Sequence, residues 1–163
     1  MLTGRVSVVV PLVPSHDIYL AGLMEQISEE ADLIKKVFVC RSSGRVDNLE
    51  HLKQNINFLE NRYQLRIELL STHRRQSAGQ NRNAGWKASV SEFTAFLDAD
   101  DCYASGRLGI MLEVATKHKS DLVLHDFIMP TVPEFTFPDD KWGFGDLIHT
   151  EALRQATFPI GRR

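Results

Sequence analysis

Short runs of β-branched and other apolar residues alternate with amphipathic stretches along most of the chain, and this alternation restricts the fold more than any other feature. Val6–Val10 is the first such run; Pro11 ends it, and residues 17–31 then carry apolar side chains at helical spacing. Strands that alternate with helices form a mostly parallel sheet covered by helices, so the sequence predicts an α/β fold. The predicted strands are 6–10, 36–40, 65–70, 93–97 and 121–127, and the predicted helices are 17–31, 46–59, 76–89, 106–118 and a short one at 150–156.

Two local features refine this prediction. Ser15 or Asp17 is available to cap the first helix, because both side chains accept hydrogen bonds from free backbone amides. Ala78 and Gly79 have almost no side chain, which predicts that the start of helix 76–89 packs close to another part of the chain.

Length and composition exclude several classes of protein. At 163 residues, with 43% hydrophobic and 25% charged residues, the chain is expected to form one folded domain. A net charge of -2 offers no broad cationic surface, so nucleic acid is not the expected partner. The longest apolar stretch, residues 6–13, is too short to span a membrane, and the first residues do not read as a secretory signal. The expected location is the cytoplasm, with attachment to the inner face of the membrane left open.

The most informative segment is acidic and follows the fourth predicted strand. Asp98, Asp100 and Asp101 lie within four residues, at the carboxyl edge where open α/β sheets bind their ligands. Like charges this close repel one another unless a cation or hydrogen-bond donors compensate them. Mg²⁺ or Mn²⁺ bridging to a diphosphate would fit these oxygen ligands. The alternative is that Asp98 and Asp101 only cap the following turn and face solvent.

Three segments, in this order, resemble glycosyltransferase family 2, whose members are inverting enzymes with the GT-A fold. They are residues 6–11 with Tyr19 and Leu20, residues 76–85 with Arg82-Asn83-Ala84-Gly85, and residues 96–101 followed by Arg107 and Leu108. The resemblance implies a single GT-A-like, Rossmann-like domain. Residues 1–128 would bind a nucleotide-diphosphate sugar, and residues 129–163 would be an incomplete acceptor-side region.

By the same resemblance, the enzyme would transfer a sugar, with inversion, to a hydroxyl of a glycan or another acceptor. Asp100 would be the principal ligand of a divalent cation, Mn²⁺ or Mg²⁺, and Asp98 would contact ribose or the metal. Pro11 and Leu12 would lie where the nucleotide base packs. Arg75, Arg82 and Asn83 fall in the donor-binding segment. Polysaccharide biosynthesis is the setting that the family implies.

Two departures from the family pattern bear on function. Many members carry an Asp after the second strand that bonds the base, whereas here residues 39–44 read Val-Cys-Arg-Ser-Ser-Gly. Arg41 and Ser42 would either bond a different base or line the loop. Residues 145–153 resemble the stretch just upstream of the family's Glu-Asp base motif, which does not follow. A shortened glycosyltransferase is therefore expected, and the rival is a non-catalytic sugar-nucleotide-binding or interaction module.

The last 35 residues combine prolines with aromatic side chains, which is typical of a loop folded over a site or a partner. A subunit interface, and hence a homo-oligomer, is one reading of this region. Asp140 and Asp146 are the late carboxylates that could replace the base, although such residues are more often solvated. The remaining candidates are His125 and His149 as ligands, Trp142 as a sugar platform, Trp86 as a core residue, and Cys40 and Cys102 as small buried side chains.

Overall fold

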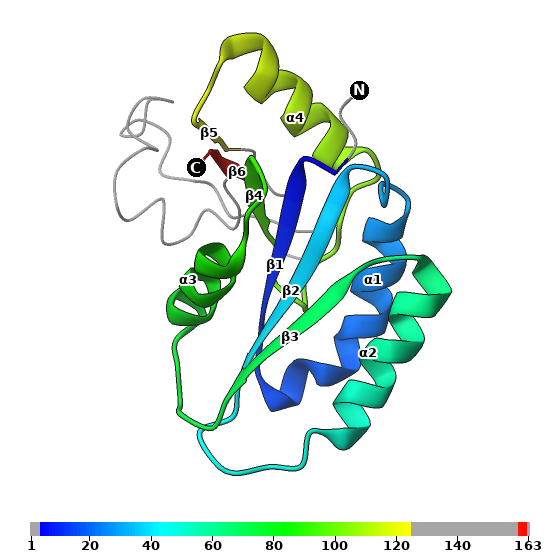
Figure 1. Cartoon of the computed structure of the whole chain (residues 1–163), viewed down its shortest axis with the longest axis vertical. Helices are drawn as coiled ribbons and strands as arrows, with labels where there is room; N and C mark the ends of the chain where they lie inside the picture. Colours follow the sequence, from blue (N-terminus) through cyan, green and yellow to red (C-terminus); the bar gives the residue numbers. More distant parts are fainter. Residues whose placement is uncertain (1–3, 125–159, 163) are drawn as a thin grey trace, which may run out of the picture.

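The computed structural model describes residues 4–124 and 160–162 of the chain. A six-stranded sheet with the strand order β3-β2-β1-β4-β6-β5 forms its centre (Figure 1). The strands are β1 (Val6–Leu12), β2 (Ile34–Ser42), β3 (Ile67–Thr72), β4 (Phe93–Phe96), β5 (Leu122–Val123) and β6 (Ile160–Arg162). The helices are the 3-10 helix η1 (Pro14–Tyr19), α1 (Leu20–Ser28), α2 (Glu50–Tyr63), α3 (Ala78–Ala88) and α4 (Arg107–His118).

The first four strands are parallel, so their carboxyl ends meet at one edge of the sheet. β1 pairs with β2 on one side and with β4 on the other, and β2 also pairs with β3. β6 is antiparallel to both β4 and β5. This arrangement confirms the predicted α/β fold with a mostly parallel sheet.

The two faces of the sheet are covered unequally. α1 and α2 lie on one face and α3 on the other (Figure 1). On the first face, alternate residues of β1 and β2 join buried side chains of α1, α2 and α4 in the main core. Val9, Phe38 and Cys40 point to the opposite face and form a smaller cluster, against which Ala88 of α3 packs.

α3 lies unusually close to the sheet because Gly85 has no side chain. A Cβ at Gly85 would lie 2.5 Å from Cγ1 of Val9 and 2.8 Å from Sγ of Cys40, which is too close for any other residue. The close contact was predicted for the start of this helix, but a Cβ at Gly79 would meet only Ser77 Oγ, at 3.8 Å. That part of the prediction is wrong: the contact falls six residues later, at Gly85.

Other differences from the prediction concern the ends of elements. β1 continues through Pro11 to Leu12, and a 3-10 helix with no side-chain cap precedes α1 where one continuous helix was predicted. Asp17 does not cap, because its carboxylate binds Arg41. β5 is only two residues long. β6, which the sequence pattern did not predict, lies between β4 and β5 in the sheet. The predicted helix 150–156 lies outside the described residues.

No helix in residues 4–124 has both the length and the apolar character needed to cross a bilayer.

Candidate functional site

The carboxyl edge of the parallel strands gathers the polar residues of interest. η1, in the loop after β1, carries His16 and Asp17; β2 ends with Arg41 and Ser42; and the loop after β4 carries the acidic segment. This is the edge at which open α/β sheets bind ligands. The candidate site is built on it.

Arg82 of α3 makes the central contact of the acidic segment. Its Nη2 donates to both carboxylate oxygens of Asp98, each at 2.7 Å, and both side chains are partly exposed. The capping box of Ser77 and Gln80 fixes the start of α3, and Gly85 holds the helix against the sheet, so the reach of Arg82 to Asp98 is set by the fold. α3 thereby joins two of the three segments that pointed to a family resemblance.

Asp100 lies further out. Its Oδ1 is 3.7 Å from Nδ1 of His16, whose ring packs edge-on against Tyr19. The sequence patterns did not single out His16. The loop after β1 thus lies beside the acidic loop after β4, although some 80 residues separate them in the chain.

The acidic segment carries more negative charge than its cations offset. Desolvation raises the pKa of Asp101, and the charges of Asp98 and Asp100 raise it further, while Arg107 and Arg82 act against this shift. Crowding of like charges of this kind would be relieved by a cation. Within the described residues, however, no group of three or more His, Cys, Asp or Glu side chains is arranged to hold a metal ion.

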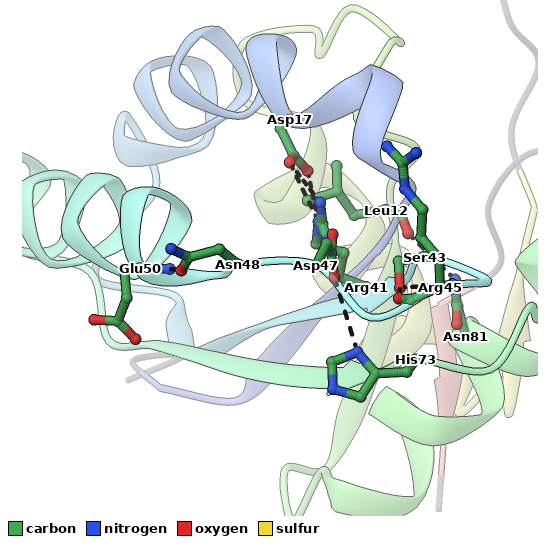
Figure 2. A network of polar contacts seen from close by, with 10 residues as sticks. All are labelled: Leu12, Asp17, Arg41, Ser43, Arg45, Asp47, Asn48, Glu50, His73 and Asn81. Carbon is green, nitrogen blue, oxygen red and sulfur yellow. Dashed lines mark hydrogen bonds and ion pairs between the residues drawn. The ribbon is translucent and has the colours of Figure 1, made fainter.

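Arg41 forms a second and different cluster at the same edge. Its guanidinium is buried and donates to Asp17 through Nε and Nη2, both at 2.9 Å, and to Asp47 through Nη1 at 2.6 Å. Figure 2 shows Arg41 between the two carboxylates, with His73 of the loop after β3 on the far side of Asp47, where its Nδ1 lies 3.8 Å from Oδ1. The hydrogen bond from Arg41 lowers the pKa of Asp47, and the charge of Arg41 lowers it further. One arginine thus joins the loops that follow β1 and β2, and His73 extends the cluster to the loop after β3.

Asn81 is a buried polar residue that the sequence patterns did not single out as a separate contact. Its Nδ2 donates to Ser42 Oγ at 3.0 Å and to the carbonyl oxygen of Leu12 at 3.4 Å, which ties α3 to the ends of β1 and β2. Beside it lies an open hollow of about 420 Å³ between α3 and the end of β3, lined in part by Ser71, Thr72 and Gln76. The family motif around residues 76–85 was the available signal for Asn81.

The remaining predicted residues lie as follows. Pro11 and Leu12 are the last two residues of β1 and are buried, whereas Arg75 and Asn83 are exposed. Trp86 was expected in the core but is 41% exposed, because the buried face of α3 is formed by Asn81 and Gly85. Cys40 is buried as expected, and burial raises its pKa to about 12. Cys102 is exposed, so the expectation that it is buried is wrong; it lies in the loop just after the acidic residues. Asp140, Asp146, His125, His149 and Trp142 lie outside the described residues.

The comparison with protein families decides the assignment. The model of glycosyl transferase family 2 matches residues 15–159, which is most of the chain. The chain belongs to glycosyl transferase family 2. The match includes most of η1, the Arg82 helix and the acidic segment, whereas Pro11 and Leu12 precede it. A search of curated protein sequences gave no significant match.

Solved structures agree with this family 2 assignment at the level of the fold. S. aureus TarS 1-349 superposes with a TM-score of 0.60 at 22% identity over 83% of this chain, and a second structure of it is a complex with UDP-GlcNAc. The mannosyltransferase PcManGT from Pyrobaculum calidifontis, in complex with GDP-Man and Mn²⁺, superposes with a TM-score of 0.61 at 16% identity over 76% of the chain. The chain spans 40% of the length of that TarS chain and 36% of PcManGT. These likenesses confirm the GT-A fold predicted for this family 2 chain.

Proposed function

We propose that the chain binds a nucleotide-diphosphate sugar and a divalent cation at the carboxyl edge of the sheet and transfers the sugar to an acceptor hydroxyl with inversion. The observation that carries the proposal is the contact between Arg82 and Asp98 beside Asp100, in a chain that belongs to a glycosyltransferase family. The neighbours that bind UDP-GlcNAc and GDP-Man support a nucleotide sugar as the ligand class.

Arg82 and Asp98 would exchange partners when the donor binds. Without a ligand, each neutralises the other through Nη2 and both carboxylate oxygens. A diphosphate offers Arg82 an anion of higher charge, and a bound cation offers Asp98 a stronger partner than a guanidinium. Because both side chains are partly exposed, separating them costs little in the absence of other changes.

Asp98 and Asp100 would hold the divalent cation, with diphosphate oxygens completing its ligands. Two carboxylates plus substrate phosphates is the usual arrangement for Mg²⁺, and it agrees with the lack of a group of three protein ligands among the described residues. When bound, Mg²⁺ or Mn²⁺ would offset the charge that develops on the departing diphosphate. The main chain of Pro11 and Leu12 would contact the base, and exposed Arg75 and Asn83 would contact the donor from the side of α3.

Arg41 has a different task. Its donors are directed at Asp17 and Asp47, so it would shape the wall of the base site by fixing two loops and would not bond the base itself. Ser42 is buried and its hydroxyl accepts from Asn81, so it too would shape this wall. For the general base that deprotonates the acceptor, Asp146 and Asp140 remain predictions from the sequence.

Calorimetric titration tests the donor site. UDP-, GDP- and dTDP-sugars are titrated with and without Mn²⁺ into the wild-type chain, into Asp100→Ala and into Glu113→Gln, a matched control that removes an exposed carboxylate of α4. Mn²⁺-dependent binding of one nucleotide class to the wild type and the control, lost in Asp100→Ala, would support the proposal. Absence of binding to every donor would contradict it.

Turnover is tested separately. The donor that binds is incubated with the chain, and slow transfer of its sugar to water is followed by NMR. The anomeric configuration of the released sugar is recorded before it equilibrates. Inverted sugar that requires Mn²⁺ would support an inverting transferase. Binding without any turnover, in the presence of candidate hydroxyl acceptors as well, would favour the non-catalytic sugar-nucleotide module.

A further inference from the structure

A buried carboxylate that the proposed function does not use lies behind the acidic segment. Glu30, just beyond the end of α1, is 8% exposed and accepts three hydrogen bonds. They come from the hydroxyl of Tyr103 at 2.7 Å, the backbone amide of Leu108 at 3.0 Å and the backbone amide of Gly109 at 2.7 Å. The two amides belong to the first turn of α4, whose N-cap residue, Gly106, supplies no side-chain cap. Glu30 therefore caps α4 from another element of the fold.

Gly109 is what lets Glu30 come this close. A Cβ at that position would lie 3.2 Å from Oε1 of Glu30, tighter than most real contacts of this kind. Arg107 adds to the same cluster, because its guanidinium lies over the ring of Tyr103, 5.3 Å from the ring centre. The first turn of α4 thus packs against a carboxylate that follows the carboxyl end of α1.

Tyr103 carries this attachment into the acidic loop. It follows Asp101 by two residues, is itself buried, and is held at two points. Its backbone amide donates to Oε1 of Gln26 at 2.6 Å, and its hydroxyl donates to Glu30. Both acceptors lie at the end of α1, so the carboxyl end of the acidic loop is fixed to a core helix, while Arg82 holds its amino end through Asp98.

We propose that Glu30, Gln26 and Tyr103 are positioning residues for the donor site, which hold the loop of Asp98 and Asp100 in the geometry that receives the cation and diphosphate. The inference rests on the proposed function, since it assigns these residues to the same site. A carboxylate ligand that is fixed before binding loses less conformational freedom on binding than one on a loose loop. Tyr103 touches neither donor nor cation in this proposal and acts through the loop alone.

Tyr103→Phe weakens the attachment of the loop and spares the carboxylate that caps α4. It removes the hydroxyl, which also accepts from the Leu108 amide at 3.1 Å, but leaves Glu30 bonded to the amides of Leu108 and Gly109. Gln26→Met removes the acceptor of the Tyr103 amide and should act in the same direction. Tyr63→Phe, which removes a hydroxyl from a half-buried tyrosine at the end of α2, is the matched control.

Two measurements are made on each variant. Hydrogen exchange, recorded without ligand, compares amides in residues 98–106 with those in 110–115 of α4; titration with Mn²⁺ and the donor that binds the wild type measures affinity. For Tyr103→Phe and Gln26→Met we expect loop exchange about fivefold faster with α4 unchanged, and donor affinity about fivefold weaker. Tyr63→Phe should match the wild type in both.

The outcomes separate this inference from the proposed function. If the wild type binds no donor, the proposed function fails and the positioning role fails with it. If the wild type binds a donor and both loop variants bind it equally well, the positioning role alone is overturned. Exchange that accelerates by one common factor in the loop, α4 and the sheet would also overturn it, because that result reports a general loss of stability.

Discussion

Two arginine clusters lie at the same edge of the sheet, and they differ in how completely they are paired. The Arg41 side chain is 6% exposed and contacts two carboxylates, Asp17 and Asp47, through Nε and both terminal nitrogens. The Arg82 side chain is 28% exposed and contacts Asp98 through Nη2. The first arrangement holds loops together, whereas the second leaves both partners accessible to a ligand.

The comparison also extends to charge. Asp17 and Asp47 share one buried guanidinium, and Asp47 is stabilised in its charged form. Asp98, Asp100 and Asp101 lie within four residues, and the raised pKa of Asp101 shows that its charged form is disfavoured. Carboxylates that raise one another's pKa are suited to bind a cation, while carboxylates that share a buried guanidinium are suited to hold loops in place.

Arg41→Met should have the largest effect on stability. It leaves Asp17 and Asp47 without their cation and releases the two loops, so we expect the free energy of unfolding to fall by about 2–3 kcal/mol. Urea denaturation followed by circular dichroism measures it. Arg82→Met is the matched control and should cost less than about 1 kcal/mol, because its pair is partly exposed. Equal losses in the two variants would contradict the distinction drawn between the clusters.

Arg82→Met should instead change binding, and in opposite directions for two ligands. Asp98 is freed from its arginine, so affinity for Mn²⁺ alone should rise by about two- to threefold. A cation for the diphosphate is lost, so affinity for the nucleotide sugar in saturating Mn²⁺ should fall by about tenfold. Calorimetry measures both. If both affinities fall together, the exchange of partners proposed for Arg82 and Asp98 is incorrect.

The acid dependence of stability should distinguish the clusters next. Since Arg41 holds the pKa of Asp47 below its usual range, the folded state binds fewer protons there than the unfolded state. That contribution is complete above the unfolded value of about 3.9 and is lost as the pH falls through the lowered folded value. Unfolding free energies measured from pH 6 to pH 2.5 should therefore fall less steeply in Arg41→Met than in the wild type. Parallel curves would show that Asp47 contributes nothing through this pair.

Asp101→Asn should have the smallest effect, with the opposite sign. The pKa of Asp101 is raised, so its contribution to stability is present below its unfolded pKa and is lost as the pH rises through the folded value. Removing the charge at pH 7, in the absence of divalent cations, should raise Tm by about 1–2 °C, whereas Asp47→Asn should lower Tm. Differential scanning fluorimetry compares the two. A decrease in both variants would mean that the charges of the acidic segment are already balanced.

The sequence was sufficient for the fold because its signals were repeated. Each parallel strand is a short apolar run followed by a helix of matching period, and the four parallel strands were all predicted within a few residues of their observed ends. β6 could not be predicted in the same way, because a strand of three residues is too short to show a periodic pattern. It lies between β4 and β5 in the sheet but far from both in the sequence. Trp86 was misplaced because the face of α3 that packs is built from Asn81 and Gly85, which a search for apolar spacing passes over.

The candidate site was predictable where a local motif marked its residues and unpredictable where three loops meet. Asp98, Asp100 and Arg82 stood out from family motifs and strand position, and Arg82 does contact Asp98. The pairing of Arg41 with Asp17 depends on the 3-10 helix after β1, and its pairing with Asp47 depends on the loop after β2. Glu30 gave no signal, because a carboxylate after a helix is usually solvated and only the packing of α4 buries it.

The two cysteines have a practical consequence. Cys40 is sealed under Gly85 of α3, and burial raises its pKa to about 12, so its thiol is slow to react. Cys102 is exposed in the loop that follows Asp101. A thiol-directed fluorophore would therefore label the native chain at one place, beside the acidic residues, and would report on that loop without any engineered mutation. In the same sample, the rate at which Cys40 is labelled would measure how often α3 separates from the sheet.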